Sequence, residues 1–113
     1  MVSAVATDRL DRTFAALADP TRRDILRRCA IDAPSVSRLA EAYPMSFAAV
    51  QKHVAVLERA GLVAKERRGR ETLGRTDAAA VARARRALDE LEDLWRGRVA
   101  RMSDVLSEEG NPQ

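Results

Sequence analysis

Apolar residues recur at three- and four-residue intervals between residues 46 and 63, where Val50, Val54 and Leu57 define one stripe. This spacing predicts an amphipathic helix. Ser46 before it is a good N-cap, because its hydroxyl can accept hydrogen bonds from the first turn, and Gly61 after it can take the left-handed conformation that ends a helix. The opposite face is small, polar and cationic, and it carries Ala48, Gln51, Lys52, Ala55 and Arg59. Such a face fits the DNA major groove, although an ordinary amphipathic surface helix would show the same pattern.

Three helices are predicted before this one. The first covers about residues 8–18, and the second starts at Asp19-Pro20, which reads as an N-cap followed by a proline at the first helical position. The third is short, is capped by Ser35 and ends before Pro44, because proline disfavours helical geometry in the residue before it. Two short helices joined by a tight turn over about residues 35–61 predict a helix-turn-helix.

After Gly61 the pattern changes to that of a hairpin. Two short strands are predicted within residues 62–76, and Arg68-Gly69-Arg70 forms the turn between them, where glycine supplies the positive φ. Directly after a helix-turn-helix, a hairpin with a cationic tip is typical of a wing. The alternative is a solvated hairpin whose charges prevent aggregation at a sheet edge.

Asp77 is the predicted N-cap of a long last helix over about residues 77–107. Apolar residues keep a three-to-four spacing along it, and about 30 helical residues extend for roughly 45 Å. A chain of this size cannot cover such a stripe alone. We therefore expect the first helix to cover part of it and a second copy of the chain to cover the rest. The residues predicted for this dimer interface are Leu10, Phe14, Leu17, Leu88, Leu91, Trp95 and Met102.

Length and charge placement refine this picture. The 113 residues are predicted to form a single domain, 1–113, that is mainly α with a small β-hairpin: a winged helix-turn-helix of about five helices plus the wing. Residues 59–75 carry six basic and two acidic side chains, so this block alone is +4, whereas the whole chain is +3. A short cationic block among balanced segments indicates a local contact with a polyanion.

Cysteine and histidine usage limits the chemistry. Cys29 is the only cysteine, so no intrachain disulfide can form and a reducing cytoplasm is expected. The N-terminal residues lack the basic start and apolar run of a signal peptide, and no apolar stretch approaches the length of a bilayer span, so we expect neither a secretion signal nor a membrane helix. A tight transition-metal site needs about four ligands, and besides carboxylates the chain offers only Cys29 and His53. No nucleophile–base constellation is present either, so we predict no enzyme activity, no metal and no other cofactor.

In this order of elements the sequence resembles the ArsR-type (arsenic-repressor-like) winged-helix transcriptional regulators. The resemblance spans about residues 10–77 and is carried by Phe14 to Leu26 with its Ala18-Asp19-Pro20-Thr21-Arg22, by Leu39-Ala40-Glu41, Met45-Ser46, Val50 to Val63, and Arg68-Gly69-Arg70. It implies a homodimeric repressor whose first and last helices form the dimer interface. It also implies that the Ser46 helix enters the major groove of double-stranded DNA and that the wing touches the backbone or minor groove. It leaves the effector ligand unknown.

Three features depart from the family pattern. Metal-sensing members carry a paired-cysteine motif in the third helix, where this chain reads Ser35-Val36-Ser37-Arg38-Leu39. Others carry histidine and acidic ligands on the last helix, which here contains no histidine. Leu73-Gly74 stands where the family often has a large aromatic residue in the returning strand. The resemblance is therefore to a branch that lacks the metal-binding cysteine motif.

The Ser46 helix supplies the residues predicted to read DNA. Gln51 and Lys52 are assigned to base edges or adjacent phosphates, and Ala48 and Phe47 to thymine methyl groups. Ser46 would cap the helix and hold a phosphate at once, because a helix N-terminus attracts anions.

The remaining polar candidates have a second interpretation each. His53, at the edge of the apolar stripe, is either packed or bonded to a phosphate. The hairpin-tip arginines are assigned to phosphates, which adds affinity but little sequence choice; they are Arg67, Arg68 and Arg70. In the second helix the arginines are expected to point mostly outward, and Arg22 and Arg23 either bind phosphates or solvate their helix. A winged-helix protein-interaction module that binds no DNA is the alternative function.

Overall fold

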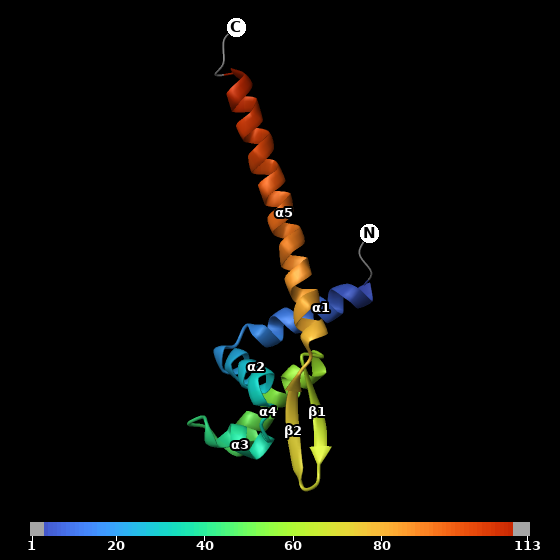
Figure 1. Cartoon of the computed structure of the whole chain (residues 1–113), viewed down its shortest axis with the longest axis vertical. Coiled ribbons are helices and arrows are strands. Elements are labelled where there is room, and N and C mark those ends of the chain that lie inside the picture. The colour runs from blue at the N-terminus through green and yellow to red at the C-terminus, as the bar shows by residue number, and fades with distance from the viewer. Residues whose placement is uncertain (1–3, 110–113) are drawn as a thin grey trace. The chain divides into compact units, whose positions relative to one another are not determined.

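The computed structural model describes residues 4–109, which form five helices and one antiparallel hairpin (Figure 1). The elements are α1 (Ala4–Leu17), α2 (Pro20–Asp32), α3 (Val36–Glu41), α4 (Phe47–Arg59), β1 (Val63–Arg68), β2 (Glu71–Thr76) and α5 (Ala78–Glu109). This order confirms the predicted winged helix-turn-helix. One boundary was wrong: α1 begins at Ala4 and not near residue 8, because the preceding stretch contains alanines and no helix-breaking residue.

The chain divides into two compact units. The first ends at Val81 and the second begins at Ala82, and α5 continues from one into the other. The first unit contains α1 to α4 and the hairpin, and the described part of the second unit is a single helical segment.

Hydrogen bonds at the helix starts confirm the predicted caps. Three side chains each accept a bond of 3.1 Å from the N–H three residues later: Asp19 for α2, Ser35 for α3 and Ser46 for α4. Asp77 Oδ1 accepts from the N–H of Ala79 at 3.0 Å at the start of α5. Each cap contributes about 1 kcal/mol to helix stability.

The core of the first unit is built against the buried face of α4. Its largest fully buried side chains come from four segments and are Ile25, Leu39, Leu57, Leu62, Val50 and Val54. Burying each such side chain contributes roughly 1.5–3 kcal/mol. At the end of α4, Gly61 has a φ of +76° and the N–H of Leu62 donates to the carbonyl of Leu57 at 3.0 Å. This is the predicted helix ending, and it sets the position at which α4 stops.

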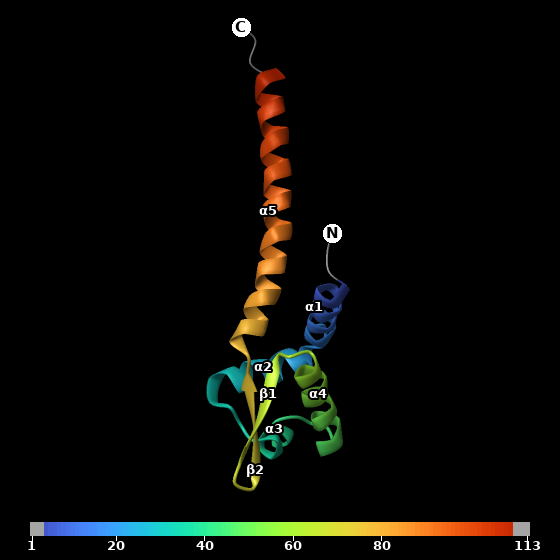
Figure 2. The ribbon, with the colours of Figure 1, turned by 90° about the vertical axis from the view of Figure 1, so that its right-hand side faces the viewer.

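The hairpin pairs β1 with β2 in an antiparallel register that sets Arg68 opposite Glu71. Gly69 has a φ of +61° at the turn, as predicted. Figure 2 shows that the hairpin tip and the N-terminal end of α4 point toward the same end of the first unit. The predicted reading helix and wing therefore face one side.

The base of the hairpin is fixed to α2 and to the segment before α3. The N–H of Gly74 donates to the carbonyl of Pro34 at 3.0 Å, and Leu73 forms an isolated bridge with Ser35. Gly74 is buried, and a Cβ on it would lie 3.0 Å from the Sγ of Cys29. The residue pair Leu73-Gly74 thus places the returning strand closer to α2 than a side chain at Gly74 would allow.

The last helix, α5, runs without interruption through Gly97. In the single chain its large apolar side chains remain exposed, in contrast to those of α4. The exposed residues between positions 88 and 106 are Leu88, Leu91, Leu94, Trp95, Val99, Met102, Val105 and Leu106. An exposed apolar surface of this extent is typical of an interaction site.

Candidate nucleic-acid interface

The burial of one face of α4 determines which side chains its other face presents. Val50, Val54 and Leu57 are fully buried, so the residues between them turn outward. Gln51 and Lys52 are exposed. A helix held in this way offers a short cationic and amide-bearing face, and those groups match the hydrogen-bonding edges of bases in a major groove.

The first turn of α4 is also exposed. Ser46 is exposed while its Oγ accepts the N–H of Ala49. Ala48 is exposed, and Phe47 retains 47% of its accessible surface. A large aromatic ring left this exposed at the start of a helix is available for an apolar contact, such as one with a thymine methyl group.

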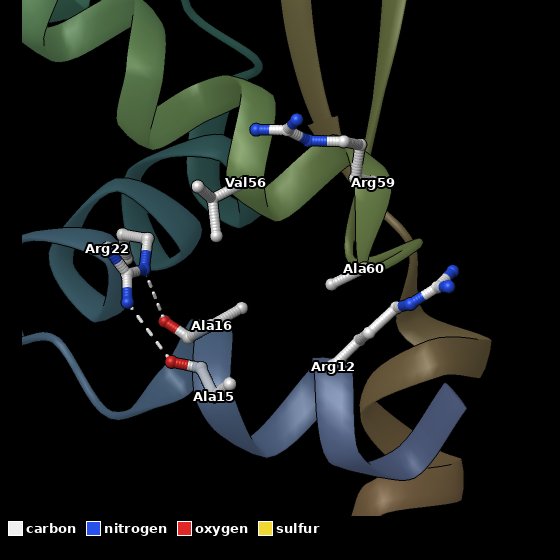
Figure 3. Close-up of a pocket in the computed structure, with 7 residues that line it drawn as sticks. All are labelled: Arg12, Ala15, Ala16, Arg22, Val56, Arg59 and Ala60. Atoms are coloured by element: carbon white, nitrogen blue, oxygen red, sulfur yellow. Dashed lines mark hydrogen bonds between the residues drawn. The ribbon is translucent and has the colours of Figure 1, made fainter. Parts of the chain in front are cut away.

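The position of Arg22 differs from the outward one expected from sequence. Its Nε donates to the carbonyl of Ala16 at 2.7 Å and its Nη2 to that of Ala15 at 3.0 Å (Figure 3). Its side chain is only 18% exposed. Arg22 therefore caps the carbonyl end of α1, which carries partial negative charge, and it does not extend into solvent toward a phosphate.

His53 lies beside that arginine. Its Nδ1 is 3.4 Å from Nη1 of Arg22, and the residue is half-buried. Because arginine has no acceptor atoms, this bond requires Nδ1 of His53 to be the accepting nitrogen. Of the residues predicted for DNA contact on α4, His53 is thus the one held inward, and it links the reading helix to the end of α1.

A groove of about 560 Å³ separates α1 from the second half of α4 (Figure 3). Small apolar residues form much of its wall, and three arginines stand around it; the lining residues are Arg12, Ala15, Ala16, Arg22, Val56, Arg59 and Ala60. Arg22 reaches from α2 to the carbonyls of α1 at this groove. Nothing in the sequence pattern predicted it, because its walls come from segments more than thirty residues apart.

The hairpin tip is cationic, as predicted. Arg67, Arg68 and Arg70 are all exposed. Glu66 lies between two cations, with Oε1 3.7 Å from Nε of Arg68 and Oε2 3.5 Å from Nη2 of Arg75. Exposed pairs of this kind are worth at most about 1 kcal/mol, so Arg68 can exchange Glu66 for a phosphate. The prediction from sequence did not include Arg75.

The helix-turn-helix is joined to α2 by a polar cluster around Asp24. The hydroxyl of Tyr43 donates to Oδ2 of Asp24 at 2.6 Å, and Nε of Arg28 donates to the same oxygen at 2.9 Å. Arg27 donates to Oδ1 at 2.8 Å. The bond from Tyr43, followed by that from Arg28, lowers the pKa of Asp24 to about 2, while burial and the bond to Asp24 raise the pKa of Tyr43 to about 12. Arg27 and Arg28, which point outward, thus bind the carboxylate of Asp24.

Cys29 occupies the buried face of α2. Burial raises the pKa of its thiol to about 11, with a smaller effect of Asp32. Among residues 4–109 no three His, Cys, Asp or Glu side chains come together in a way that could hold a metal ion. No helix in the same range is long and apolar enough to cross a membrane.

In this structure α4 follows a tight turn and buries one face, and a cationic hairpin points toward the same side. Together these features define a winged helix-turn-helix DNA-binding protein. Comparisons with known proteins agree. A family model described as a helix-turn-helix domain matches residues 17–66. The chain is 34% identical over 101 residues to the HTH-type transcriptional regulator Rv2034 of Mycobacterium tuberculosis, over 89% of this chain and 92% of that protein.

Two solved structures extend the comparison. An ArsR-like transcriptional regulator from Rhodococcus sp. RHA1 matches with a TM-score of 0.80 and 32% identity, over 90% of this chain and 96% of that chain. The homodimeric winged helix-turn-helix DNA-binding domain of Mb0332 from Mycobacterium bovis, a possible ArsR-family regulator, matches with a TM-score of 0.65 and 26% identity, over 82% and 91% of the chains. The chain belongs to the ArsR-type winged helix-turn-helix transcriptional regulators. It is a DNA-binding regulator and not an enzyme.

Proposed function

We propose that this chain is a cytoplasmic repressor that binds an inverted-repeat operator as a homodimer. The observation that carries the proposal is the common direction of the α4 N-terminus and the hairpin tip (Figure 2). The two elements can then contact adjacent parts of one duplex, with α4 in the major groove and the hairpin on the backbone or minor groove.

Within this proposal each site residue has a role. Gln51 and Lys52 contact base edges, and Ala48 and Phe47 contact thymine methyl groups. The phosphate contacts come from Ser46 and from the hairpin-tip residues Arg67, Arg68 and Arg70. His53 supports α4 through its contact with Arg22. Any phosphate that it contacts lies at the edge of the site.

The dimer in this proposal forms through α1 and α5. Phe14 on α1 is partly exposed, and the apolar stripe on α5 is open in the single chain; its predicted interface residues are Leu88, Leu91, Trp95 and Met102. Leu10 and Leu17 are half-buried, and Leu17 packs against the core of its own chain. Leu17 therefore holds α1 against the core of its own chain. The homodimeric state of the Mb0332 domain supports the proposal that this chain forms a dimer.

Selection of bound sequences from a random duplex pool tests the proposal, followed by sedimentation of the complex with the selected duplex. We expect an inverted repeat whose half-sites lie about 34 Å apart and a complex of two chains per duplex. The affinity should fall steeply with added salt, because phosphate contacts release counterions. Enrichment of no sequence, or equal affinity for all duplexes, would favour the protein-interaction module instead.

A further inference from the structure

The middle of the exposed apolar surface of α5 contains five residues that are symmetric about one position. Trp95 is the centre, Leu91 and Val99 each lie four residues from it, and Leu88 and Met102 each lie seven residues from it. Because four and seven residues are about one and two helical turns, these side chains share one narrow face. Each is at least 44% exposed in the single chain. A stripe that reads the same in both directions matches a second copy of itself when the two helices run antiparallel.

The charges on α5 change sign about the same centre. Residues 89–93 carry four acidic side chains and no basic one, and residues 96–101 carry three arginines and no acidic side chain. Antiparallel pairing about Trp95 brings the acidic segment of one copy level with the basic segment of the other. Parallel pairing in register would set like charges side by side. Packed helices lie about 8–10 Å apart, which is close to the screening length at physiological salt, so the charges favour the antiparallel arrangement.

A pair of charges next to the centre adds to this preference. Nη2 of Arg96 lies 3.3 Å from Oε1 of Glu92, and the two residues are one turn apart on the same edge of the stripe. A two-fold axis at Trp95, perpendicular to the helices, brings the two copies of this pair to the same edge of the interface. They then form a cluster of four alternating charges.

We propose that α5 pairs with the α5 of a second copy in antiparallel register, with Trp95 on the two-fold axis. Leu91 then meets the partner's Val99, and Leu88 meets the partner's Met102. The proposal rests on the homodimer proposed above and specifies which residues meet and which way the helices run. With a rise of 1.5 Å per residue, the two copies of Leu88 lie about 21 Å apart along the pair, whereas Leu88 and the partner's Met102 lie at one height.

Single-cysteine cross-linking under mild oxidation tests this register. All variants carry Cys29→Ala, so that each chain has only the introduced thiol. A disulfide requires Cα atoms within about 7 Å. Trp95→Cys is expected to cross-link with itself, and co-expressed Leu88→Cys and Met102→Cys chains are expected to cross-link with each other. Leu88→Cys alone, Met102→Cys alone and the outer-face control Ala100→Cys are expected to give no cross-linked dimer.

Three results overturn the register. Cross-linking of Leu88→Cys with itself would show parallel helices, and absence of the mixed Leu88–Met102 cross-link would show a different alignment. The unmodified chain gives an independent measurement, because Trp95 is its only tryptophan. Its fluorescence emission should move to longer wavelength as the protein is diluted through dimer dissociation, and emission that stays constant while sedimentation reports monomers would exclude Trp95 from the interface.

Binding of the reduced cysteine variants to the selected duplex separates the two proposals. The expected cross-links without DNA binding would remove the proposed function and leave the register in place. DNA binding together with cross-links other than those expected would overturn the register and leave the proposed function in place.

Discussion

Tyr43 and Asp24 are joined by a hydrogen bond of 2.6 Å from the phenol to Oδ2, which connects the end of the α3 region to α2 across nineteen residues of sequence. The bond holds the helix-turn-helix on α2, whose Arg27 and Arg28 bind the same carboxylate. It also makes the stability of the fold depend on the charge of one carboxylate.

The stability of the protein is expected to fall in acid through Asp24. Its pKa is lowered to about 2 in the folded chain and is about 3.9 in an unfolded one. The stabilisation is therefore complete above about pH 5 and is lost as the pH falls from there toward 2. Because the carboxylate is partly solvated, we expect about 1 kcal/mol rather than the full value of the shift. Urea unfolding of the native chain and of Asp24→Asn at pH 7 and pH 3 measures this contribution. The difference in the free energy of unfolding between the two proteins should be smaller at pH 3 than at pH 7. An undiminished difference would contradict this role.

Arg22 and Arg23 provide a matched pair of substitutions. Arg22→Ala removes two bonds to the carbonyls that end α1, and we expect a loss of about 1.5–3 kcal/mol in the free energy of unfolding. Arg23→Ala removes one exposed bond to the carbonyl of Leu17 and should change that free energy by no more than about 0.5 kcal/mol. Denaturant unfolding compares them. A salt slope of DNA binding that drops by about 1 in folded Arg22→Ala would instead show that Arg22 binds a phosphate.

Gly74 is expected to tolerate no side chain while Cys29 is present. A Cβ at Gly74 would meet the Sγ of Cys29 at 3.0 Å, so Gly74→Ala should cost about 1–3 kcal/mol of stability. Gly97→Ala is the control, since a Cβ there meets only the flexible end of Arg101 at 3.5 Å and should stabilise the helix by up to about 1 kcal/mol. Adding Cys29→Ala to Gly74→Ala should recover more than about 0.5 kcal/mol in a double-mutant cycle. Strictly additive effects would show that the two residues do not compete for space.

Zinc, cadmium and arsenite are expected not to act as inducers at a site of the kinds known in the family. The thiol of Cys29 is buried with a pKa of about 11, and His53 accepts from the arginine beside it. Besides carboxylates each chain offers only these two groups, and a tight site needs about four ligands. Calorimetry on the reduced protein, paired with a DNA-release assay, measures this. Stoichiometric binding at micromolar or lower concentration with release of DNA would refute it, and its loss in Cys29→Ser would locate the site.

Local signals in the sequence were sufficient for most of the fold. Asp19, Ser35 and Ser46 cap their helices through atoms three residues away, and Gly69 provides the turn within its own hairpin. Such features depend on short-range sterics and hydrogen bonding, which a sequence displays directly. The exposed face of α4 was predictable for the same reason, because the buried stripe fixes it.

The contacts between distant segments were not predictable from pattern alone. Arg22 looked like one of several outward arginines, and its inward position depends on where α1 ends relative to α2. The close approach of Gly74 to Cys29 joins residues forty-five positions apart, and no spacing rule relates them. Sequence reasoning places residues on a face of an element, whereas tertiary packing decides which faces meet.

In the proposed function α4 reads the DNA sequence, while the hairpin tip adds affinity without sequence preference. Fluorescence anisotropy with the selected duplex and a scrambled duplex, at two salt concentrations, tests it most directly. Lys52→Ala and Gln51→Ala are expected to weaken binding to the selected duplex by roughly 5- to 100-fold and to change binding to the scrambled one much less. Arg68→Ala should weaken both about equally and lower the salt slope by about 1, while Arg86→Ala on α5 should change neither. Unchanged affinity of all three interface variants for the selected duplex would show that this helix does not read DNA.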